Sequence, residues 1–340
     1  MVNFTKVKKV LIVRTDRIGD VLLNLPAVEL IKKKIPQAQF TLITSPQLVG
    51  LLQDQPVFNE VINYDFYRNK PFKLWLFLLR RRFDLCLVMN PQKNFHALSF
   101  LSLIPYRCGY DRKCGKLLNF RKKDVKSLGT KHEIEYNLDL LKELGLSYSP
   151  SSINFHLSTR ERHEKKIRAL LTDLFQNENT PFITIHPFAS VPYKEWPFER
   201  YAELTTKIKE AYPHLRIIFV GQDNVEQKIE LPRETSNLIN KLDLNELTAL
   251  LKRAQLLIST DSGPLHIAAG VKTKTIALFG PGFSYSSPTR WGPWGHNHIV
   301  IHKKYNCSPC GQSPCTQNFG CMKSITVDEV FKAFTKQMMS

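Results

Sequence analysis

The chain has 340 residues, of which 43% are hydrophobic, and this is enough to form the cores of two domains. It holds 48 Lys and Arg against 30 Asp and Glu, and residues 68–131 alone hold 16 basic residues against Asp84, Asp111 and Asp124. Such a field favours a polyanionic partner, either a phosphorylated lipid, an anionic membrane surface or nucleic acid, although a solvated basic face is the simple alternative. No nucleic-acid-binding module is recognisable, so nucleic acid is not an expected partner.

The sequence contains no uninterrupted run of 18 apolar residues, so no transmembrane helix is expected. The first apolar run breaks at Arg14 and Asp16, which indicates a strand and excludes a signal peptide. We therefore expect a cytoplasmic protein.

Strands and helices alternate through the first part of the chain, as in a doubly wound parallel sheet. The pattern predicts strands at 10–14, 40–44, 61–64 and 85–89, and helices at 21–34, 73–82, 96–103 and 131–144. The serine-rich stretch 147–158 has no strong period and is predicted to be a linker. A first domain at 1–146 follows from these features.

The alternation resumes after the linker. The pattern predicts helices at 161–175, 197–211 and 245–253, strands at 182–185, 217–220, 256–258 and 275–279, and a last helix at 326–338. Thr326 and Glu329 have the spacing of a capping box at the start of that helix. These elements predict a second α/β domain at 159–325, followed by a terminal helix at 326–340.

The stretch 256–281, LLISTDSGPLHIAAGVKTKTIALFGP, has the most informative pattern. Strand, small polar turn, helix and strand form a βαβ unit, whose ligands bind beyond the carboxyl end of the first strand. Asp261 or Ser262 would cap the helix, and the amides of its first turn would face an anion such as a diphosphate. An ordinary capped helix explains the same spacing equally well.

Asp20 follows the first strand and Gly19, at the predicted start of a helix. A loop carboxylate in this place is available as a general base, but position alone favours a helix cap. The helix N-terminus would lower the pKa of Asp20, and burial would raise it. Asp16, on the same loop, is the second candidate for the base.

Lys194 follows the strand at 182–185 and precedes Trp196 and Pro197. A lysine there could stabilise the negative charge of a departing diphosphate. In so basic a chain, a plain surface lysine is the alternative.

Several of these segments together resemble glycosyltransferase family 9, the lipopolysaccharide heptosyltransferases. DSGPLH, from Asp261 to His266, resembles the donor-binding signature of the family, and VLIVRTDRIGDVLLNLP at 10–26 is similar to its opening strand, Gly-Asp loop and first helix. KEWP at 194–197 and the late cysteine cluster ending in Cys321-Met322 also fit. These motifs occur in the family's order over nearly the whole chain. The resemblance implies two Rossmann-like doubly wound domains facing a cleft, the GT-B glycosyltransferase fold, with the terminal helix packed back on the first domain.

The resemblance also implies an activity: an inverting, metal-independent transfer of heptose from ADP-heptose to the inner core of lipopolysaccharide, with Kdo-lipid A or a heptosyl acceptor. No cofactor is implied, and the enzyme would act as a monomer at the cytoplasmic face of the inner membrane. In this reading Asp20 removes the acceptor proton and Lys194 stabilises the leaving diphosphate. The implied donor-binding residues are Ser190, Lys194, Glu226, Asp261, Ser262, Gly263 and His266. The implied acceptor-binding residues, in the first domain, are Gly19, Lys93, His96, Arg107, Arg112 and Lys131.

Two local features keep two interpretations each. Cys307, Cys310, Cys315 and Cys321 have the spacing C-x2-C-x4-C-x5-C, which fits a structural zinc site or reduced thiols, and the resemblance favours thiols without a metal. The apolar segment 71–79, followed by three arginines, fits either contact with an anionic membrane or a buried core helix.

Two rival functions also remain open. The chain could be a family 9 transferase that uses another nucleotide sugar or glycan acceptor. From a different class, it could be a non-catalytic protein that binds anionic glycolipid or nucleic acid. The sequence does not determine the exact sugar, acceptor position or linkage.

Overall fold

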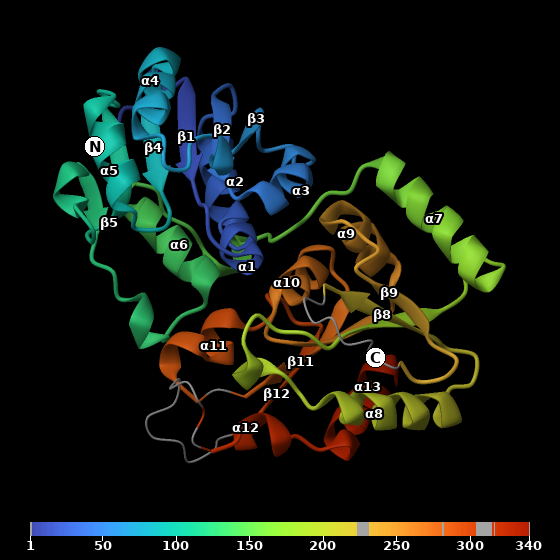
Figure 1. Ribbon diagram of the computed structural model, residues 1–340. Helices are drawn as coiled ribbons and strands as arrows, with labels where there is room; N and C mark the ends of the chain where they lie inside the picture. The colour runs from blue at the N-terminus through green and yellow to red at the C-terminus, as the bar shows by residue number, and fades with distance from the viewer. Residues whose placement is uncertain (1, 223–230, 281, 304–314, 316, 340) are drawn as a thin grey trace. The chain divides into compact units, whose positions relative to one another are not determined.

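The computed structural model describes residues 2–222, 231–280, 282–303, 315 and 317–339 (Figure 1). The chain divides into two compact units, Met1–Ser158 and Thr159–Ser340. The division falls after Ser158, where the predicted linker ends. Among the described residues, no helix is both long enough and apolar enough to cross a membrane.

The first unit is built on a six-stranded parallel sheet with the strand order β3-β2-β1-β4-β5-β6. Its strands are β1 (Lys9–Val13), β2 (Gln39–Thr44), β3 (Glu60–Asn63), β4 (Leu85–Val88), β5 (Tyr106–Tyr110) and β6 (Phe120–Lys122). Its α-helices are α1 (Ile18–Leu22), α2 (Leu25–Lys34), α3 (Val49–Gln53), α4 (Pro71–Arg81), α5 (Lys93–Leu101) and α6 (Glu133–Leu141). β1 and β4 lie at the centre and are buried on both faces, so they are apolar without alternation.

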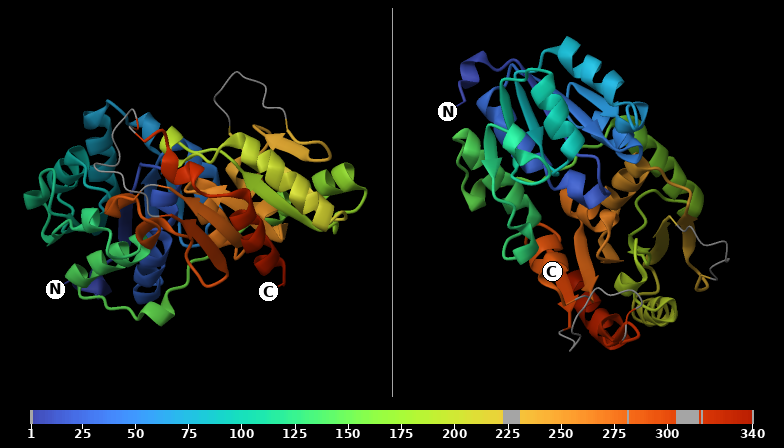
Figure 2. Two further views of the ribbon diagram at one scale, coloured as in Figure 1. Left: turned by 90° about the horizontal axis from the view of Figure 1, so that it is seen from below. Right: turned by 60° about the vertical axis from the view of Figure 1, so that its left-hand side comes forward.

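The second unit repeats this plan with the strand order β12-β11-β10-β7-β8-β9, again with parallel pairs. Its strands are β7 (Phe182–His186), β8 (Arg216–Gly221), β9 (Ser236–Ile239), β10 (Leu256–Thr260), β11 (Lys274–Phe279) and β12 (His298–His302). Its α-helices are α7 (Glu161–Phe175), α8 (Phe198–Ala211), α9 (Leu244–Arg253), α10 (Gly263–Gly270), α11 (Pro288–Trp291), α12 (Gly320–Lys323) and α13 (Val327–Met339). Helices α8 and α13 pack side by side, and α9 packs against both α7 and α10 (Figures 1 and 2).

Both sheets therefore have the doubly wound order in which the winding reverses beside the first strand of the unit. The reversal lies between β1 and β4 in the first unit, and between β7 and β10 in the second. Ligands of such sheets bind at this reversal, beyond the carboxyl ends of the strands. The predicted α/β class with two doubly wound sheets is confirmed. The sequence pattern missed β5, β6 and β9, because these strands are short or lack a continuous aliphatic run. It also missed β12, whose aliphatic run Ile299-Val300-Ile301 lies between two histidines.

The last helix is part of the core of the second unit. Val330 and Phe334 of α13 are completely buried, and the ring of Phe334 meets that of Tyr212 edge to face with centroids 5.3 Å apart. The predicted cap of this helix is confirmed, since Thr326 N–H donates to Glu329 Oε2 at 2.8 Å and Glu329 N–H donates to Thr326 Oγ1 at 3.3 Å. The predicted packing of α13 on the first domain stays a prediction.

Removing the Phe334 ring should destabilise the second unit. Phe334→Ala leaves a cavity between α13, Tyr212 and the sheet, and we expect a loss of about 3–5 kcal/mol in the free energy of unfolding. Urea denaturation followed by tryptophan fluorescence measures this loss. Met339→Ala on the same helix is the matched control, because the side chain of Met339 is 80% exposed. Equal stability of the two variants would contradict the role of α13 in the core.

Candidate active site

One group of candidate site residues lies at the reversal of the first sheet. Arg14 directly follows β1, and its backbone N–H donates to Ile43 O of β2. Four residues further on, α1 begins at Ile18 with Arg17 at the cap position. Asp20 therefore lies inside the first turn of the helix, and the alternative that it caps the helix is wrong. Gly19, the neighbour of Asp20, is buried in the same turn.

A buried guanidinium fixes the carboxylate of Asp20. The side chain of Arg14 is only 4% exposed, and its Nη2 donates to Asp20 Oδ1 at 2.7 Å. Its Nε donates to Asp16 Oδ1 at 2.7 Å, and its Nη1 donates to Met89 O, just after β4, at 2.9 Å. One arginine thus ties a loop carboxylate, Asp16, and a helix carboxylate, Asp20, to the ends of both central strands. Such charge-assisted hydrogen bonds are stronger than those between neutral groups.

A second layer of charge lies behind this arginine. Glu133, fully buried on α6, has its Oε1 3.8 Å from Arg14 Nη2. Lys126 donates to the same Glu133 oxygen at 2.5 Å and to Asn137 Oδ1 at 2.8 Å, and Asn137 Nδ2 donates to Leu23 O at 3.1 Å. Sequence reasoning missed this layer. The sequence indicated it only through Glu133 and Asn137, which are four residues apart among the apolar residues of α6.

Burial raises the pKa of Asp20 to about 6. Arg14 opposes this shift, whereas the negative charges of Asp16 and Glu133 add to it. The sequence left open whether the helix N-terminus or burial would dominate, and burial dominates. A carboxylate with such a pKa is ionised at neutral pH and is more basic than an ordinary aspartate, as a general base requires.

Lys93 and His96, both predicted to contact the acceptor, lie in different surroundings on α5. Lys93 is exposed as the first residue of the helix. His96 is completely buried, and its Nδ1 lies 3.0 Å from Lys113 O. Burial also lowers the pKa of His96, so that its ring is neutral. A structural role of His96 explains these contacts, and its role toward an acceptor stays a prediction.

The other basic residues predicted to bind the acceptor do not join the cluster around Arg14. Arg107 stands in the amino-terminal half of β5, and its guanidinium donates to Leu117 O at 2.9 Å and to Ile104 O. Arg112 Nη1 pairs with Asp124 at 2.8 Å. Lys131 Nζ pairs with Asp139 at 2.5 Å. Carboxylates of the same unit therefore already compensate the charges of Arg112 and Lys131.

In the second unit, the structure brings together two residues predicted to bind the donor. Lys194 lies in a short turn after β7, and Asp261 directly follows β10. Lys194 Nζ donates to Asp261 Oδ2, and the two side chains are 13% and 7% exposed. Asp261 thus orients the lysine, whose ammonium carries three donors and retains others for an anion.

Ser262 has the cap position of α10, but its hydroxyl makes no capping bond. Its Oγ instead lies 3.2 Å from His186 Nδ1 and 3.0 Å from Ser259 Oγ. Burial lowers the pKa of His186 to about 4, so the ring is neutral, and in the tautomer with its proton on Nε2 it accepts from Ser262. The amides of the first turn of α10 are therefore not satisfied by this hydroxyl, and they can serve an anion instead. Sequence reasoning missed His186, whose signal was its place at the end of β7.

The remaining donor-binding predictions have separate outcomes. Gly263 begins α10, and His266 is buried on that helix with its ring centroid 6.4 Å from that of Trp291. Ser190 is exposed on the loop that follows β7. Glu226 lies outside the described residues. Their roles toward a donor stay predictions.

A glycine gives His186 the room it needs. Gly221, which ends β8, has a φ of +138°, a conformation that side chains rarely adopt. A Cβ built there would lie 2.6 Å from Phe188 Cδ2 and 2.9 Å from His186 Cδ2. A larger residue at this position would therefore displace the histidine that holds Ser262.

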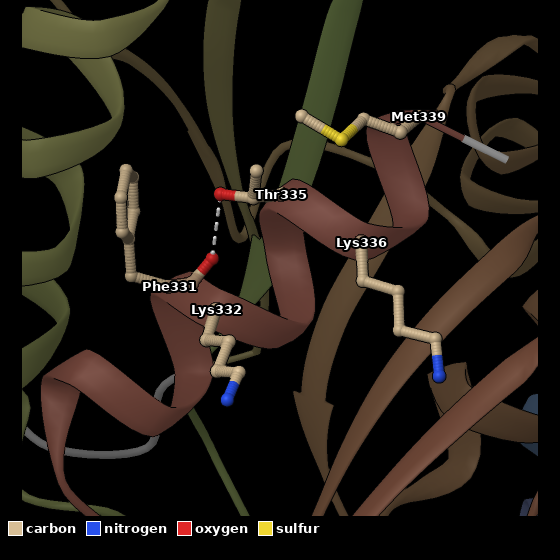
Figure 3. A pocket seen from close by; sticks show the side chains of 5 residues that line it. All are labelled: Phe331, Lys332, Thr335, Lys336 and Met339. Atoms are coloured by element: carbon tan, nitrogen blue, oxygen red, sulfur yellow. Dashed lines mark hydrogen bonds between the residues drawn. The ribbon is translucent and has the colours of Figure 1, made fainter.

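Two hollows of the second unit lie away from these residues. One, of about 550 Å³, is lined by residues of α13 alone, namely Phe331, Lys332, Thr335, Lys336 and Met339 (Figure 3). The other lies beside α8 and includes Thr205 and Glu234. Neither contains a predicted site residue. The predicted residues lie instead near the ends of the central strands.

Half of the cysteine cluster can be placed. Cys321 is buried and Cys315 is half-buried. Cys307 and Cys310 lie outside the described residues. In the part of the chain that the structure describes, no group of three or more histidine, cysteine or carboxylate side chains could hold a metal ion. The state of the whole cluster stays a prediction.

Comparison with known proteins decides the family. The family model described as Glycosyltransferase family 9 (heptosyltransferase) matches residues 72–319, about three quarters of the chain. The chain belongs to this family. It is therefore a glycosyltransferase, as predicted.

Named relatives of this family 9 chain carry different titles. The lipopolysaccharide core heptosyltransferase OpsX of Haemophilus influenzae is 27% identical over 318 residues, covering 88% of this chain and 85% of that protein. Lipopolysaccharide heptosyltransferase 3 of Escherichia coli is 26% identical, covering 83% and 84%. The structure of the E. coli ADP-heptose lipopolysaccharide heptosyltransferase II has a TM-score of 0.78 at 20% identity, covering 97% and 98%. This last likeness confirms the predicted GT-B fold class.

Asp16 should control the pKa of Asp20. Asp16→Asn removes a negative neighbour, while the amide oxygen of asparagine can still accept from Arg14 Nε, so we expect the pKa of Asp20 to fall below its present value of about 6. Carbon-13 NMR titration of labelled aspartates measures this pKa. Asp65→Asn is the matched control, because Asp65 pairs with Arg68 and belongs to none of the contacts of Asp20. An unchanged or higher pKa in Asp16→Asn would contradict this account.

Proposed function

We propose that this family 9 enzyme transfers a heptose from ADP-heptose to the inner core of lipopolysaccharide, with inversion and without a metal ion. One observation carries the proposal. Asp20, a carboxylate at the reversal of the first sheet, is held by a buried arginine and has a raised pKa. The relatives support the sugar and the class of acceptor through their titles.

In the proposed reaction, Asp20 acts as the general base. The acceptor hydroxyl gives its proton to Asp20, and its oxygen attacks the anomeric carbon of the heptose. The bond from that carbon to the diphosphate breaks at the same time, and ADP leaves with the electron pair. Attack on the face opposite the leaving group inverts the anomeric centre. Arg14 acts as a positioning residue that keeps the carboxylate of Asp20 in one place.

Groups at the reversal of the second sheet would hold the leaving diphosphate. Lys194, oriented by Asp261, supplies a positive charge. The amides at Ser262 and Gly263, left without a serine cap, supply oriented donors at the start of α10. His266 would donate to a phosphate or the sugar, Ser190 to a phosphate, and Glu226 would bind the ribose hydroxyls. These neutralising groups could replace the metal ion that other transferases use.

The positive charge of the first unit fits an anionic acceptor. Residues 1–150 hold 25 Lys and Arg against 13 Asp and Glu. Lys93 is the strongest candidate for binding an acceptor phosphate, because it is exposed. The other proposed acceptor-binding residues are weaker candidates: Gly19, His96, Arg107, Arg112 and Lys131. Since the relatives include heptosyltransferases with different titles, both Kdo-lipid A and a heptosyl acceptor fit, and another sugar or acceptor of the same chemistry is the alternative. The enzyme would act as a monomer at the cytoplasmic face of the inner membrane.

Asp20→Asn should abolish turnover. The amide keeps the shape of the side chain but accepts no proton, so we expect a loss of about 10²–10⁴-fold in ADP release from ADP-heptose and Kdo-lipid A. In the unmodified enzyme, kcat/KM should fall tenfold per pH unit below about 6, because protonated Asp20 is no longer a base. Asp65→Asn is the matched control and should keep full activity, because Asp65 pairs with Arg68 and belongs to none of the contacts of Asp20. Asp16→Asn should move this limb to lower pH. Full activity of Asp20→Asn would assign the base to another residue.

Lys194→Gln should weaken the chemical step. Loss of the ammonium removes a charge that stabilises the departing diphosphate, and we expect a decrease of about 10²–10³-fold in kcat. ADP binding measured by calorimetry should weaken as well. Lys165→Gln on the exposed surface of α7 is the matched control and should change neither value. Normal turnover of Lys194→Gln would contradict the proposed role of Lys194 in donor binding.

A further inference from the structure

The outer surface of α4 and α5 exposes large apolar side chains. Leu103 is 78% exposed, Phe72 70%, Leu101 56% and Phe100 46%. Together with the half-buried Trp75 we call these residues the α4–α5 patch. Single exposed apolar residues are common on protein surfaces, but a contiguous group of them marks an interaction site.

Direct contacts link the members of this patch. The rings of Phe72 and Trp75 lie 5.5 Å apart, and Trp75 Nε1 donates to Leu101 O at 3.2 Å. Phe100 adjoins Leu101 in the chain, and the Arg107 guanidinium lies 5.3 Å from its ring centroid. The two helices lie side by side in the first unit (Figures 1 and 2). The patch therefore spans both helices.

Of the patch, only Trp75 packs against the core of the first unit, and the exposed Phe72, Phe100, Leu101 and Leu103 are not part of that core. On α4 the core uses Leu74 and Leu78, and on α5 it uses Phe95 and Leu98. α4 is apolar around more of its circumference than its contact with the sheet covers, which is unusual for a surface helix.

Leu103 is the most exposed apolar residue of the patch. It has a φ of +57°, in the left-handed region that favours glycine or asparagine after a helix. A large apolar side chain at this position costs conformational energy and gains no burial within the unit.

Unpaired positive charge lies along the same helix. Lys70, Lys73, Arg80 and Arg82 are exposed on and around α4, and none has a carboxylate partner among residues 2–222 and the other described segments. Two arginines nearby are compensated, since Arg81 pairs with Glu60 and Arg68 with Asp65. Apolar and basic side chains on one surface are typical of a helix that lies in the headgroup region of an anionic bilayer.

We propose that the α4–α5 patch binds the surface of a membrane that contains anionic phospholipid. Phe72, Leu101 and Leu103 enter between the headgroups, and Lys70 and Lys73 bind lipid phosphates. This proposal deepens the proposed function, because it places the enzyme at the surface that carries a lipid-linked acceptor. It answers the question that the sequence left open about 71–79: α4 contributes one face to the core and offers the other to the membrane.

Co-sedimentation with vesicles tests the proposal on the full chain. The probes are vesicles of phosphatidylglycerol mixed with phosphatidylethanolamine, compared with pure phosphatidylcholine. Lys70→Ser/Lys73→Ser should weaken binding to the anionic vesicles about fivefold for each lysine removed. Phe72→Ser/Leu103→Ser should weaken binding to the anionic vesicles about tenfold or more, because this variant lacks the apolar side chains that would enter between the headgroups.

Matched controls remove the same kinds of residue elsewhere. Lys33→Ser/Lys34→Ser takes two exposed lysines from the end of α2, and Leu128→Ser/Met339→Ser takes two exposed apolar side chains, 59% and 80% exposed. Both control variants should keep at least half of the binding of the unmodified protein to the anionic vesicles. Circular dichroism checks that every variant is folded.

Three results would overturn the proposal. The unmodified protein could fail to bind anionic vesicles, the controls could lose as much binding as the patch variants, or sedimentation could show a dimer that Phe72→Ser/Leu103→Ser dissociates. Vesicle binding is measured without donor or acceptor. Failure of this proposal is therefore distinguishable from failure of heptose transfer.

Discussion

The buried guanidinium of Arg14 is the constraint on which the candidate site residues of the first unit depend. A fully desolvated positive charge is tolerated only where carboxylates and carbonyls surround it. Asp16, Asp20 and Glu133 supply the charge, and Met89 O supplies a further acceptor. The negative groups needed to hold the arginine also repel one another. This repulsion, added to burial, keeps Asp20 basic while the arginine keeps it in place.

The same topology positions the candidate residues of the second unit, but different interactions hold them. Both sheets reverse beside their first strand, so both present loop residues at the carboxyl ends of central strands. In the second unit the candidate site residues are either neutral, as His186 is, or paired, as Lys194 and Asp261 are. His186 holds the hydroxyl of Ser262 away from the start of α10, and Asp261 holds Lys194. Hydrogen bonds made within the protein thus keep helix amides and an ammonium ready for an anion.

The first unit combines a negative cluster at its site with a positive surface. Arg14 and Glu133 are buried and Asp16 and Asp20 are partly buried, whereas much of the lysine and arginine is exposed, including Lys70, Lys73 and Lys93. Buried charges set the pKa of a single group, because few solvent molecules screen them. Exposed charges act over longer distances and favour an anionic lipid or acceptor.

The sequence by itself determined the α/β class, the central strands and the family. Continuous apolar runs such as 10–13 and 256–258 predict buried parallel strands. Short motifs such as DSGPLH are recognisable in the sequence because the turn that they form is local. It also located Asp20, Lys194 and Asp261. Only the tertiary structure decided how these residues are held. The pairing of Lys194 with Asp261 joins residues 67 positions apart, and Glu133 reaches Arg14 from another helix. Such contacts, like the burial of His96 and the exposure of Leu103, depend on how elements pack, and packing has no local signature in the chain.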